Sequence, residues 1–358
     1  MNNNRLYVDV HVLQTVPPSC LNRDDTGSPK VAMYGGVNRA RVSSQSWKKA
    51  VRDMFHEELV SEEKLGMRTK RIVQMVANEI EKLGGENPEK SAQAVLEKAG
   101  LKLKEAKNTK ELEPGALFFL SVSQAKALAE LMVREGEPDK KEAQSALTGF
   151  PGVDVALFGR MVADDPSLNT DACAQVAHSI STHKVSNEYD YFIAVDDLAP
   201  EDNAGAGMIG TVEYNSATLY RYATIAVHEL QKQLGADTTE AVHVFLDAFI
   251  RSMPKGKQNT FANWTPPDAV LVTIRSNQPI NLVGAFERPV NAGENGYRVA
   301  SAEAFVEYAK STYENWLGDP DISFVTGEMF ADLGEPISLS ALLTAAQDEI
   351  RGRLNAEE

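Results

Sequence analysis

The stretch VNRARVSSQSWKKAVRD, residues 37–53, contains two patterns that together set the fold around it. Residues 37–42 are typical of an extended strand, and from Ser44 onward the apolar residues recur with the spacing of a helix. One side of this expected helix carries the apolar set Trp47, Ala50, Val51 and Met54. The opposite side carries the polar set Gln45, Lys48, Lys49 and Arg52. The stretch therefore predicts a strand and a helix that packs on a sheet and presents a basic face.

The charge of the chain is unevenly distributed along the sequence. The 358 residues carry a formal net charge of −15. Residues 1–52 nevertheless hold eight basic and three acidic side chains, a local charge of +5 that leaves −20 for the remainder. A local basic field can capture a polyanion whatever the charge of the whole chain. We therefore expect any nucleic-acid contact to involve the N-terminal segment.

Within this segment the side chains predict a cradle for a sugar-phosphate backbone. Arg39 and Arg41 are two apart on the expected strand and would point to the same side. Ser43 lies at the start of the helix, where hydroxyls and free backbone N–H groups favour a phosphate oxygen. Lys48 and Arg52 are one turn apart and extend the field along the helix. A solvated basic face without a ligand is the alternative interpretation of the same residues.

The rest of the sequence predicts an α+β fold. Residues 5–15 alternate apolar and polar side chains as in a strand with one face buried, and further strands are expected at 153–162, 220–227 and 268–276. Residues 61–146 have the pattern of short, highly charged helices. Two alternating stretches that flank a Gly- and acid-rich tip at 200–210 predict a long hairpin. This order favours a modified ferredoxin-like sheet over a doubly wound one.

Other motifs point to few kinds of chemistry. No run of 18 apolar residues and no signal peptide is found, so we expect a cytoplasmic protein without membrane contact. Cys20 and Cys173 lack CxxC spacing, which favours buried thiols. His178 and His183 are five apart and favour structural roles over zinc binding. No metal and no cofactor is expected.

Two pairs of adjacent carboxylates leave an alternative open. Asp24-Asp25 and Asp196-Asp197 are carboxylate pairs of the kind that hold magnesium in nucleases and phosphatases. Neighbouring aspartates are also ordinary turn and cap residues. The turn interpretation is favoured for both pairs.

Several segments, taken in order, resemble the signature blocks of the CasC family, the backbone subunit of the type I-E CRISPR surveillance complex Cascade. These segments are PSCLNRDD (18–25), YGGVNRARVSSQSWKKA (34–50), VDVALFGRM (153–161), AHSISTHKV (177–185) and YFIAVDDL (191–198). The resemblance implies a modified RRM-like (ferredoxin-like) palm formed by residues 1–56 and 147–300. It also implies a helical fingers insertion at 57–146, a β-hairpin thumb at 187–213, and C-terminal helices at 301–358 that pack on the palm.

The resemblance further implies a scaffold that is not an enzyme. Copies of such a subunit bind head to tail along the CRISPR RNA, and each thumb kinks the guide at a regular interval. The guide is thereby presented for pairing with target DNA in antiviral defence, so the protein reads backbone and base pairing reads sequence. The implied partners are the CRISPR RNA, target DNA, further copies of the chain, and the large, small and guide-end cap subunits of Cascade.

Carried over residue by residue, the resemblance assigns two sets of side chains. The residues expected to contact the RNA backbone are Arg23, Lys30, Ser43, Gln45, Lys48 and Arg52. The residues expected to lie against the kinked nucleotide are Met161, Phe192 and Ile193, beside Tyr191.

The sequence also departs from the family pattern, and rival functions remain. Val37 and Asn38 stand where the pattern has basic residues. Related backbone subunits of type III complexes cleave RNA with a loop aspartate. A metal-dependent endoribonuclease that uses Asp24 or Asp25 on the same palm is therefore the alternative function, and a pure protein-interaction module is a third.

Overall fold

The computed structural model describes residues 5–106, 109, 111–162, 165–194 and 208–356. The chain divides into two compact units. Unit 1 comprises residues 1–7, 52–175 and 225–245, and unit 2 comprises residues 8–51, 176–224 and 246–358. Four long elements run through the boundaries, namely β1 (Tyr7–Ser19), α1 (Ser44–Met54), β11 (Met208–Ala226) and α8 (Thr238–Arg251).

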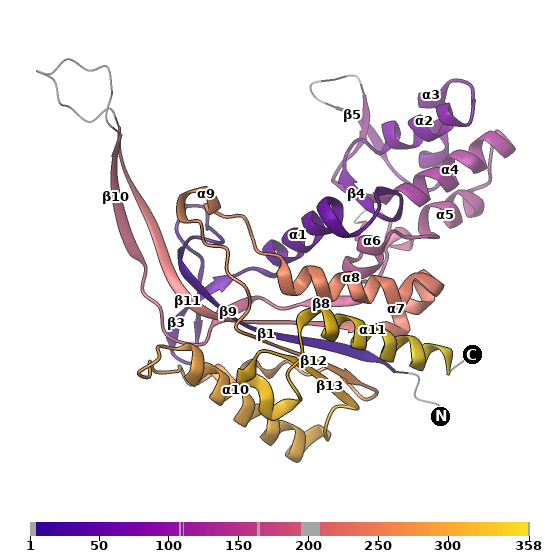
Figure 1. The fold of residues 1–358 in the computed structure, drawn as a ribbon. Coiled ribbons are helices and arrows are strands. Elements are labelled where there is room, and N and C mark those ends of the chain that lie inside the picture. The colour runs from indigo at the N-terminus through magenta and orange to yellow at the C-terminus, as the bar shows by residue number, and fades with distance from the viewer. Residues whose placement is uncertain (1–4, 107–108, 110, 163–164, 195–207, 357–358) are drawn as a thin grey trace, which may run out of the picture. The chain divides into compact units, whose positions relative to one another are not determined.

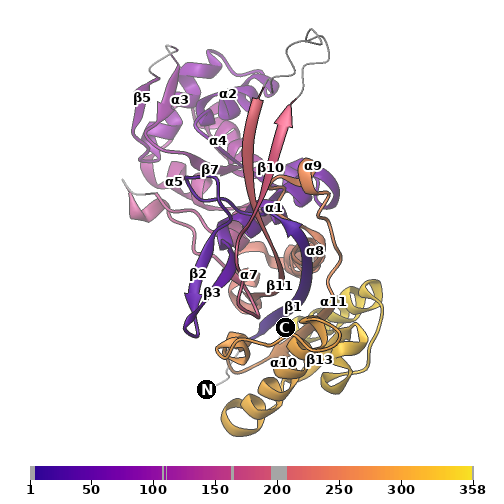
Figure 2. The same ribbon diagram turned by 90° about the vertical axis from the view of Figure 1, so that its left-hand side faces the viewer.

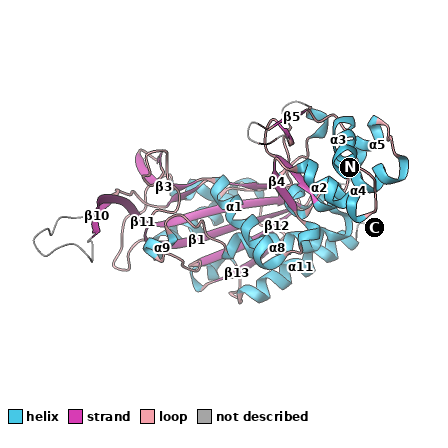
Figure 3. Ribbon diagram, turned by 90° about the horizontal axis from the view of Figure 1, so that it is seen from above, coloured by secondary structure: helices cyan, strands magenta, loops and turns pink. Residues whose placement is uncertain are grey.

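Unit 2 is built on the larger sheet, whose strand order is β13-β12-β1-β11-β9-β3-β2. Figure 3 shows β1, β11, β12 and β13 side by side. The neighbours β12 and β13, β11 and β9, β9 and β3, and β3 and β2 all pair antiparallel. The bounds of the shorter strands are β2 (Val31–Tyr34), β3 (Val37–Val42), β9 (Ser179–Ser181), β12 (Ala269–Arg275) and β13 (Ile322–Thr326).

Two apolar clusters cover opposite faces of this sheet. On one face Tyr220 of β11 packs with Phe305 of α10 (Arg298–Thr312). On the other face Leu219 of β11 packs with Trp47 of α1. Because successive residues of a strand point to opposite faces, α1 and α10 lie on opposite sides of the sheet, as Figure 1 shows. The helices α9 (Gln258–Phe261) and α11 (Leu339–Asn355) complete unit 2, and α11 contacts β13.

Unit 1 is mainly helical. The helices α2 (Ile72–Lys82), α3 (Pro88–Lys98), α4 (Val122–Glu135) and α5 (Lys140–Thr148) share one apolar core. Two small antiparallel pairs accompany them, β4 (Gly66–Thr69) with β7 (Phe118–Ser121) and β5 (Leu103–Glu105) with β6 (Leu112–Pro114). Its remaining elements include α6 (Val153–Phe158), β8 (Ala174–Val176) and α7 (Val227–Leu234). Ser121 and Asp139 begin α4 and α5 with capping boxes.

The structure confirms a mixed α and β chain with a large antiparallel sheet. The strands expected at 220–227 and 268–276 are β11 and β12, and the helix expected from Ser44 is α1. The short helices expected in 61–146 are α2 to α5, accompanied by strands that the pattern did not indicate. The division into palm, fingers, thumb and C-terminal helices stays a prediction.

The strand expected at 153–162 is wrong, because residues Val153–Phe158 form helix α6. Val153, Val155, Ala156 and Leu157 are all buried. A continuous apolar run fits a buried helix as well as a buried strand, so periodicity does not separate the two. Gly159, with a φ of 75°, ends the helix.

Strand β1 is present as expected, but both of its faces are buried. Asp9 accepts the Ile280 N–H at 2.9 Å and the Tyr222 hydroxyl at 3.0 Å. The His11 Nδ1 lies 2.8 Å from the Tyr220 hydroxyl. Burial raises the pKa of Asp9 to about 6 and lowers the pKa of His11 to about 3. Polar residues in an alternating strand therefore do not imply a solvent-facing side.

We expect the substitution His11→Phe to make the stability of the protein less sensitive to acid. Burial holds the pKa of His11 at about 3 in the folded state, against 6.5 for an unperturbed histidine. Between these values the unfolded chain binds more protons, so stability falls as the pH drops from 6.5 toward 3. In urea titrations the wild type should lose up to about 1.4 kcal/mol more per pH unit than the variant.

Asp9 works in the opposite direction and serves as an internal control. Its raised pKa makes the folded state bind the extra proton between pH 3.8 and about 6. The contribution of Asp9 to the free energy of unfolding therefore falls as the pH rises through that window. Both proteins keep Asp9, and the difference between their slopes isolates His11. Equal slopes would contradict a buried, neutral His11.

Candidate nucleic-acid interface

Helix α1 is fixed on the sheet of unit 2 by Trp47, whose side chain is fully buried. The indole Nε1–H donates to the Ser179 Oγ at 2.8 Å. The guanidinium carbon of Arg221 lies 3.9 Å from the centre of the indole ring. The expected apolar side of the helix is confirmed, since Trp47, Ala50, Val51 and Met54 are all buried. The other side of α1 is therefore turned away from the core.

The prediction that Arg39 faces a polyanion is wrong, because its side chain is fully buried. Its Nε donates to the Tyr34 carbonyl at 3.1 Å and its Nη1 to the Ser181 carbonyl at 2.9 Å. Its Nη2 donates to the carbonyls of Phe286 and Glu287 at 2.8 and 3.3 Å. Arg39 thus ties β3 to β9 and to the segment before α10. A buried guanidinium whose three nitrogens all donate hydrogen bonds has a structural role.

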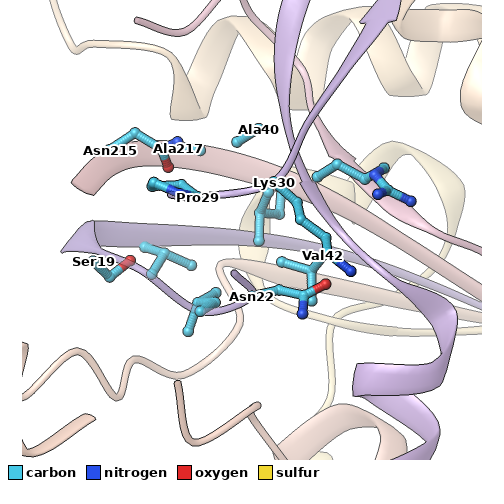
Figure 4. Close-up of a pocket in the computed structure, with 12 residues that line it drawn as sticks. Ser19, Asn22, Pro29, Lys30, Ala40, Val42, Asn215 and Ala217 are labelled. Carbon is cyan, nitrogen blue, oxygen red and sulfur yellow. The ribbon is translucent and has the colours of Figure 1, made fainter. Parts of the chain in front are cut away.

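Lys30 and Arg41 line one pocket of unit 2. The Arg41 N–H donates to the Lys30 carbonyl at 2.9 Å, and the Lys30 N–H donates to the Asn22 carbonyl at 2.8 Å. Both basic side chains are half-buried. Figure 4 shows Lys30 and Asn22 beside Val42 at this pocket. The lining residues are Val16, Ser19, Leu21, Asn22, Pro29, Lys30, Ala40, Arg41, Val42, Asn215, Ala217 and Leu219.

The start of α1 is already hydrogen-bonded within the protein. The Ser43 Oγ accepts the Ser46 N–H at 3.2 Å, which makes Ser43 the cap of the helix. The Ser43 N–H donates to the Asn22 Oδ1 at 2.9 Å. The Ser44 N–H donates to the His178 Nδ1 at 2.9 Å. The expected supply of free N–H groups at this helix start is therefore smaller than the sequence suggested.

The expected basic face of α1 is present in part. Gln45 and Lys49 are exposed and Lys48 is half-buried. Arg52 belongs to unit 1, where its Nε lies 3.8 Å from the Asp154 Oδ2 and its guanidinium carbon 4.7 Å from the centre of the Phe119 ring. Arg52 is therefore engaged by an acid and an aromatic ring, and it does not continue the basic face of Lys48 and Lys49.

Asp154, the acid beside Arg52, is itself buried. Its Oδ1 accepts the Gly66 N–H at 2.7 Å. Burial raises the pKa of Asp154 to about 6, although Gly66 and Arg52 act in the other direction. Burial also lowers the pKa of Arg52, and the attraction of Asp154 opposes that shift. Within unit 1 the pair links Arg52, near the end of α1, to α6.

The remaining residues of the expected RNA contact lie at the edge of unit 2. Arg23 is exposed and forms an isolated bridge with Pro29. Val37 is half-buried and Asn38 is exposed. RNA contact by Arg23, Lys30, Ser43, Gln45, Lys48 and Lys49 stays a prediction, as does that by Arg41.

The residues expected at the kinked nucleotide lie on a two-stranded ribbon, except Met161. Strand β10 (Glu188–Ala194) pairs antiparallel with β11, and Figure 2 shows the two strands together. Tyr191 pairs with Thr211 and Ile193 with Ile209, so these side chains share one face. Tyr191 is 59% exposed and Ile193 is 52% exposed. The expected hairpin pairing is confirmed for these strands, and its tip at 195–207 lies outside the described residues.

Phe192 points to the other face of the ribbon. It pairs with Gly210, and a Cβ at Gly210 would lie only 2.4 Å from the phenyl ring. Phe192 and Ile193 therefore lie on opposite faces of the ribbon, and their contact with a kinked nucleotide stays a prediction. Met161 belongs to unit 1 and is 84% exposed. The neighbouring Arg160 is buried and donates to the carbonyls of Leu168, Phe119 and Leu147.

The first acidic pair has the geometry of a turn. The Asp24 Oδ1 accepts the N–H groups of Thr26 and Ser28 at 2.9 and 3.0 Å. The hydrogen bond from the Thr26 hydroxyl is the largest influence that holds the pKa of Asp24 below its usual range. Asp196 and Asp197 lie outside the described residues. Within the described ranges, no group of three or more His, Cys, Asp or Glu side chains could hold a metal ion.

The cysteines and His183 have the structural roles that the sequence predicted. Cys20 and Cys173 are free and buried. The His183 Nε2 accepts the Thr218 N–H at 3.1 Å, and its ring stacks on Tyr297 with centroids 3.6 Å apart. His178 was missed as a member of the candidate interface, because its bond to Ser44 joins residues 134 positions apart. Among the helices that the structure describes, none is long and apolar enough to cross a membrane.

A large antiparallel sheet with helices on both of its faces defines a mixed α and β protein. A family model described as CT1975-like protein matches residues 8–342, and the chain belongs to this family. A chain of a solved structure titled "CRISPR RNA-guided surveillance complex, pre-nicking" is 32% identical, with a TM-score of 0.84 over 96% of this chain and 100% of that one. A chain titled "CRISPR RNA-guided surveillance complex" is 30% identical, with a TM-score of 0.63 over 96% and 99%. Comparison with curated proteins gave no match.

We expect Arg39→Met to destabilise the protein strongly. The substitution removes the guanidinium donors to the carbonyls of Tyr34, Ser181 and Phe286, which should cost on the order of 3 kcal/mol in the free energy of unfolding. Arg41→Met is the matched control, since Arg41 is half-buried and should cost about 1 kcal/mol or less. Urea unfolding measures both. If Arg39→Met kept the wild-type stability and lost RNA affinity, Arg39 would belong to the binding face after all.

Proposed function

We propose that the chain is an RNA-binding scaffold subunit of a CRISPR RNA-guided surveillance complex. The observation that carries this proposal is the similarity, over 96% of the chain and all of the compared chain, to a subunit of such a complex. The pocket lined by Lys30 and Arg41 supplies positive charge in a chain of net charge −15. Lysine and arginine side chains attract the phosphate backbone without reading its sequence. The ligand is accordingly a CRISPR RNA bound through its backbone.

The finer assignments of this proposal follow the CasC resemblance. The chain would be the type I-E backbone subunit, with an RRM-like palm and copies that bind head to tail along the guide. The thumb ribbon would kink the guide at regular intervals, and the exposed bases would pair with target DNA. Since Tyr191 and Ile193 share a face of the ribbon, they would contact the same nucleotide, and Phe192 would contact its neighbour or the partner copy. The subunit would have no catalytic role.

The second candidate function is a metal-dependent endoribonuclease that uses Asp24 or Asp25. The exposure of both residues favours it, because an exposed loop carboxylate can reach a bound RNA. The hydrogen bonds from Thr26 and Ser28 to Asp24 favour a turn instead. We therefore give precedence to the scaffold.

Lys30→Ala should weaken binding to single-stranded RNAs of any sequence to the same degree. Loss of one phosphate contact should also reduce the slope of log affinity against log salt by about 0.7. Fluorescence anisotropy with RNAs of different sequence measures both quantities. The matched control is Lys310→Ala on α10, which removes the same charge from the opposite face of the sheet. Losses that depend on RNA sequence, or an equal loss in the control, would argue against a backbone contact at Lys30.

One purified protein–RNA complex distinguishes the scaffold function from the nuclease function. The chain is co-expressed with a CRISPR RNA, and native mass spectrometry of the purified complex should find several copies per RNA. Chemical probing of the bound RNA should find reactive guide nucleotides at regular intervals. Incubation of this complex with magnesium and complementary RNA should leave that RNA intact. One copy per RNA would contradict the filament. Regular cuts that disappear in Asp24→Ala or Asp25→Ala would establish the nuclease instead.

A further inference from the structure

His178 lies where three segments of unit 2 meet. It directly precedes β9, and Ser179 of β9 pairs with Val42 of β3. This register places His178 beside the residues that follow β3, and its Nδ1 accepts the Ser44 N–H at 2.9 Å. The histidine is exposed. The third segment is the loop that contains Lys30, whose carbonyl accepts the Arg41 N–H.

The bond to Ser44 fixes the protonation state of the imidazole. A ring nitrogen that accepts an N–H carries no proton itself, so the proton of the neutral ring is on Nε2. Burial first, and then the charges of Arg41 and Lys30, lower the pKa of His178. Protonation of Nδ1 would turn two donors toward each other at the start of α1. His178 therefore accepts on one nitrogen and presents a neutral N–H on the other.

This arrangement changes which donors can meet a phosphate near α1. The Ser44 N–H is no longer available, because the imidazole occupies it. Lys30 and Arg41 supply charge on the neighbouring pocket. The Nε2–H of His178 lies farther from the helix than the Ser44 N–H that it replaces, and it belongs to an exposed residue.

We propose that His178 donates its Nε2–H to a backbone phosphate oxygen of the RNA that Lys30 and Arg41 attract. This inference rests on the proposed RNA-binding function and assigns a further contact residue to the same surface. The donor is neutral and the acceptor is charged. Loss of His178 therefore lowers affinity without reducing the number of counterions released on binding. The two cations provide the salt dependence, and the histidine fixes the position of the phosphate.

Two substitutions separate the two nitrogens of His178 in the full-length protein. His178→Asn keeps an oxygen near the place of Nδ1, which can accept from Ser44, and removes the donor at Nε2. His178→Gln keeps an amide near the place of Nε2 and removes the acceptor near Nδ1. The readouts are the thermal midpoint and the affinity for a fluorescent poly-uridine RNA at several salt concentrations.

The proposal expects opposite results for the two variants. His178→Asn should keep the wild-type midpoint and salt slope and bind the RNA about fivefold more weakly, the effect of one hydrogen bond. His178→Gln should keep nearly wild-type affinity with a lower midpoint, because α1 loses a bond at its start. Wild-type affinity in His178→Asn, or equal losses of affinity in both variants, would overturn the contact. A salt slope lowered as in Lys30→Ala would overturn the neutral donor.

The same measurements distinguish this proposal from the proposed function. If Lys30→Ala weakens RNA binding and His178→Asn does not, only the histidine contact fails. If the wild-type protein does not bind the RNA at all, the proposed function fails with it.

Discussion

The burial of Trp47 between Arg221 and Ser179 is the contact on which the candidate interface depends. Arg221 is itself buried, donates to the Gln14 side chain and to the Phe249 carbonyl, and lies over the indole ring. These contacts set the rotation of α1 about its own axis. The rotation of α1 determines which of its side chains face outward, and the sheet beneath the helix determines where these side chains lie. The basic surface is thus a property of the core beneath it.

Several arginines of this acidic chain are structural. Arg39, Arg221 and Arg275 in unit 2 are among the largest fully buried side chains, and Arg160 has the same role in unit 1. Each is surrounded by carbonyl oxygens or aromatic rings, which compensate part of the cost of desolvation. A count of basic residues therefore overstates the charge available to a ligand. Lys30 and Arg41 matter because both line the same pocket.

The spacing of apolar residues predicted local structure well, but it did not predict contacts between residues far apart in the sequence. The apolar spacing of Trp47 and Val51 gave helix α1 its correct buried side, and the alternation of β10 and β11 predicted their pairing. The same reasoning placed Arg39 on the surface, because its partners at Ser181 and Phe286 are more than 140 residues away. The hydrogen bond between His178 and Ser44 was missed for the same reason. Periodicity describes which residues share a side, and only the tertiary fold decides what covers that side.

The contact between Phe192 and Gly210 has a consequence for the evolution of the ribbon. The phenyl ring of Phe192 occupies the space that a Cβ at position 210 would need. The glycine and the aromatic ring across the strand pair therefore depend on each other. In a lineage that replaces the glycine, the ring opposite must move or give way to a smaller side chain. Sequences of this family should therefore tend to vary at the two positions together.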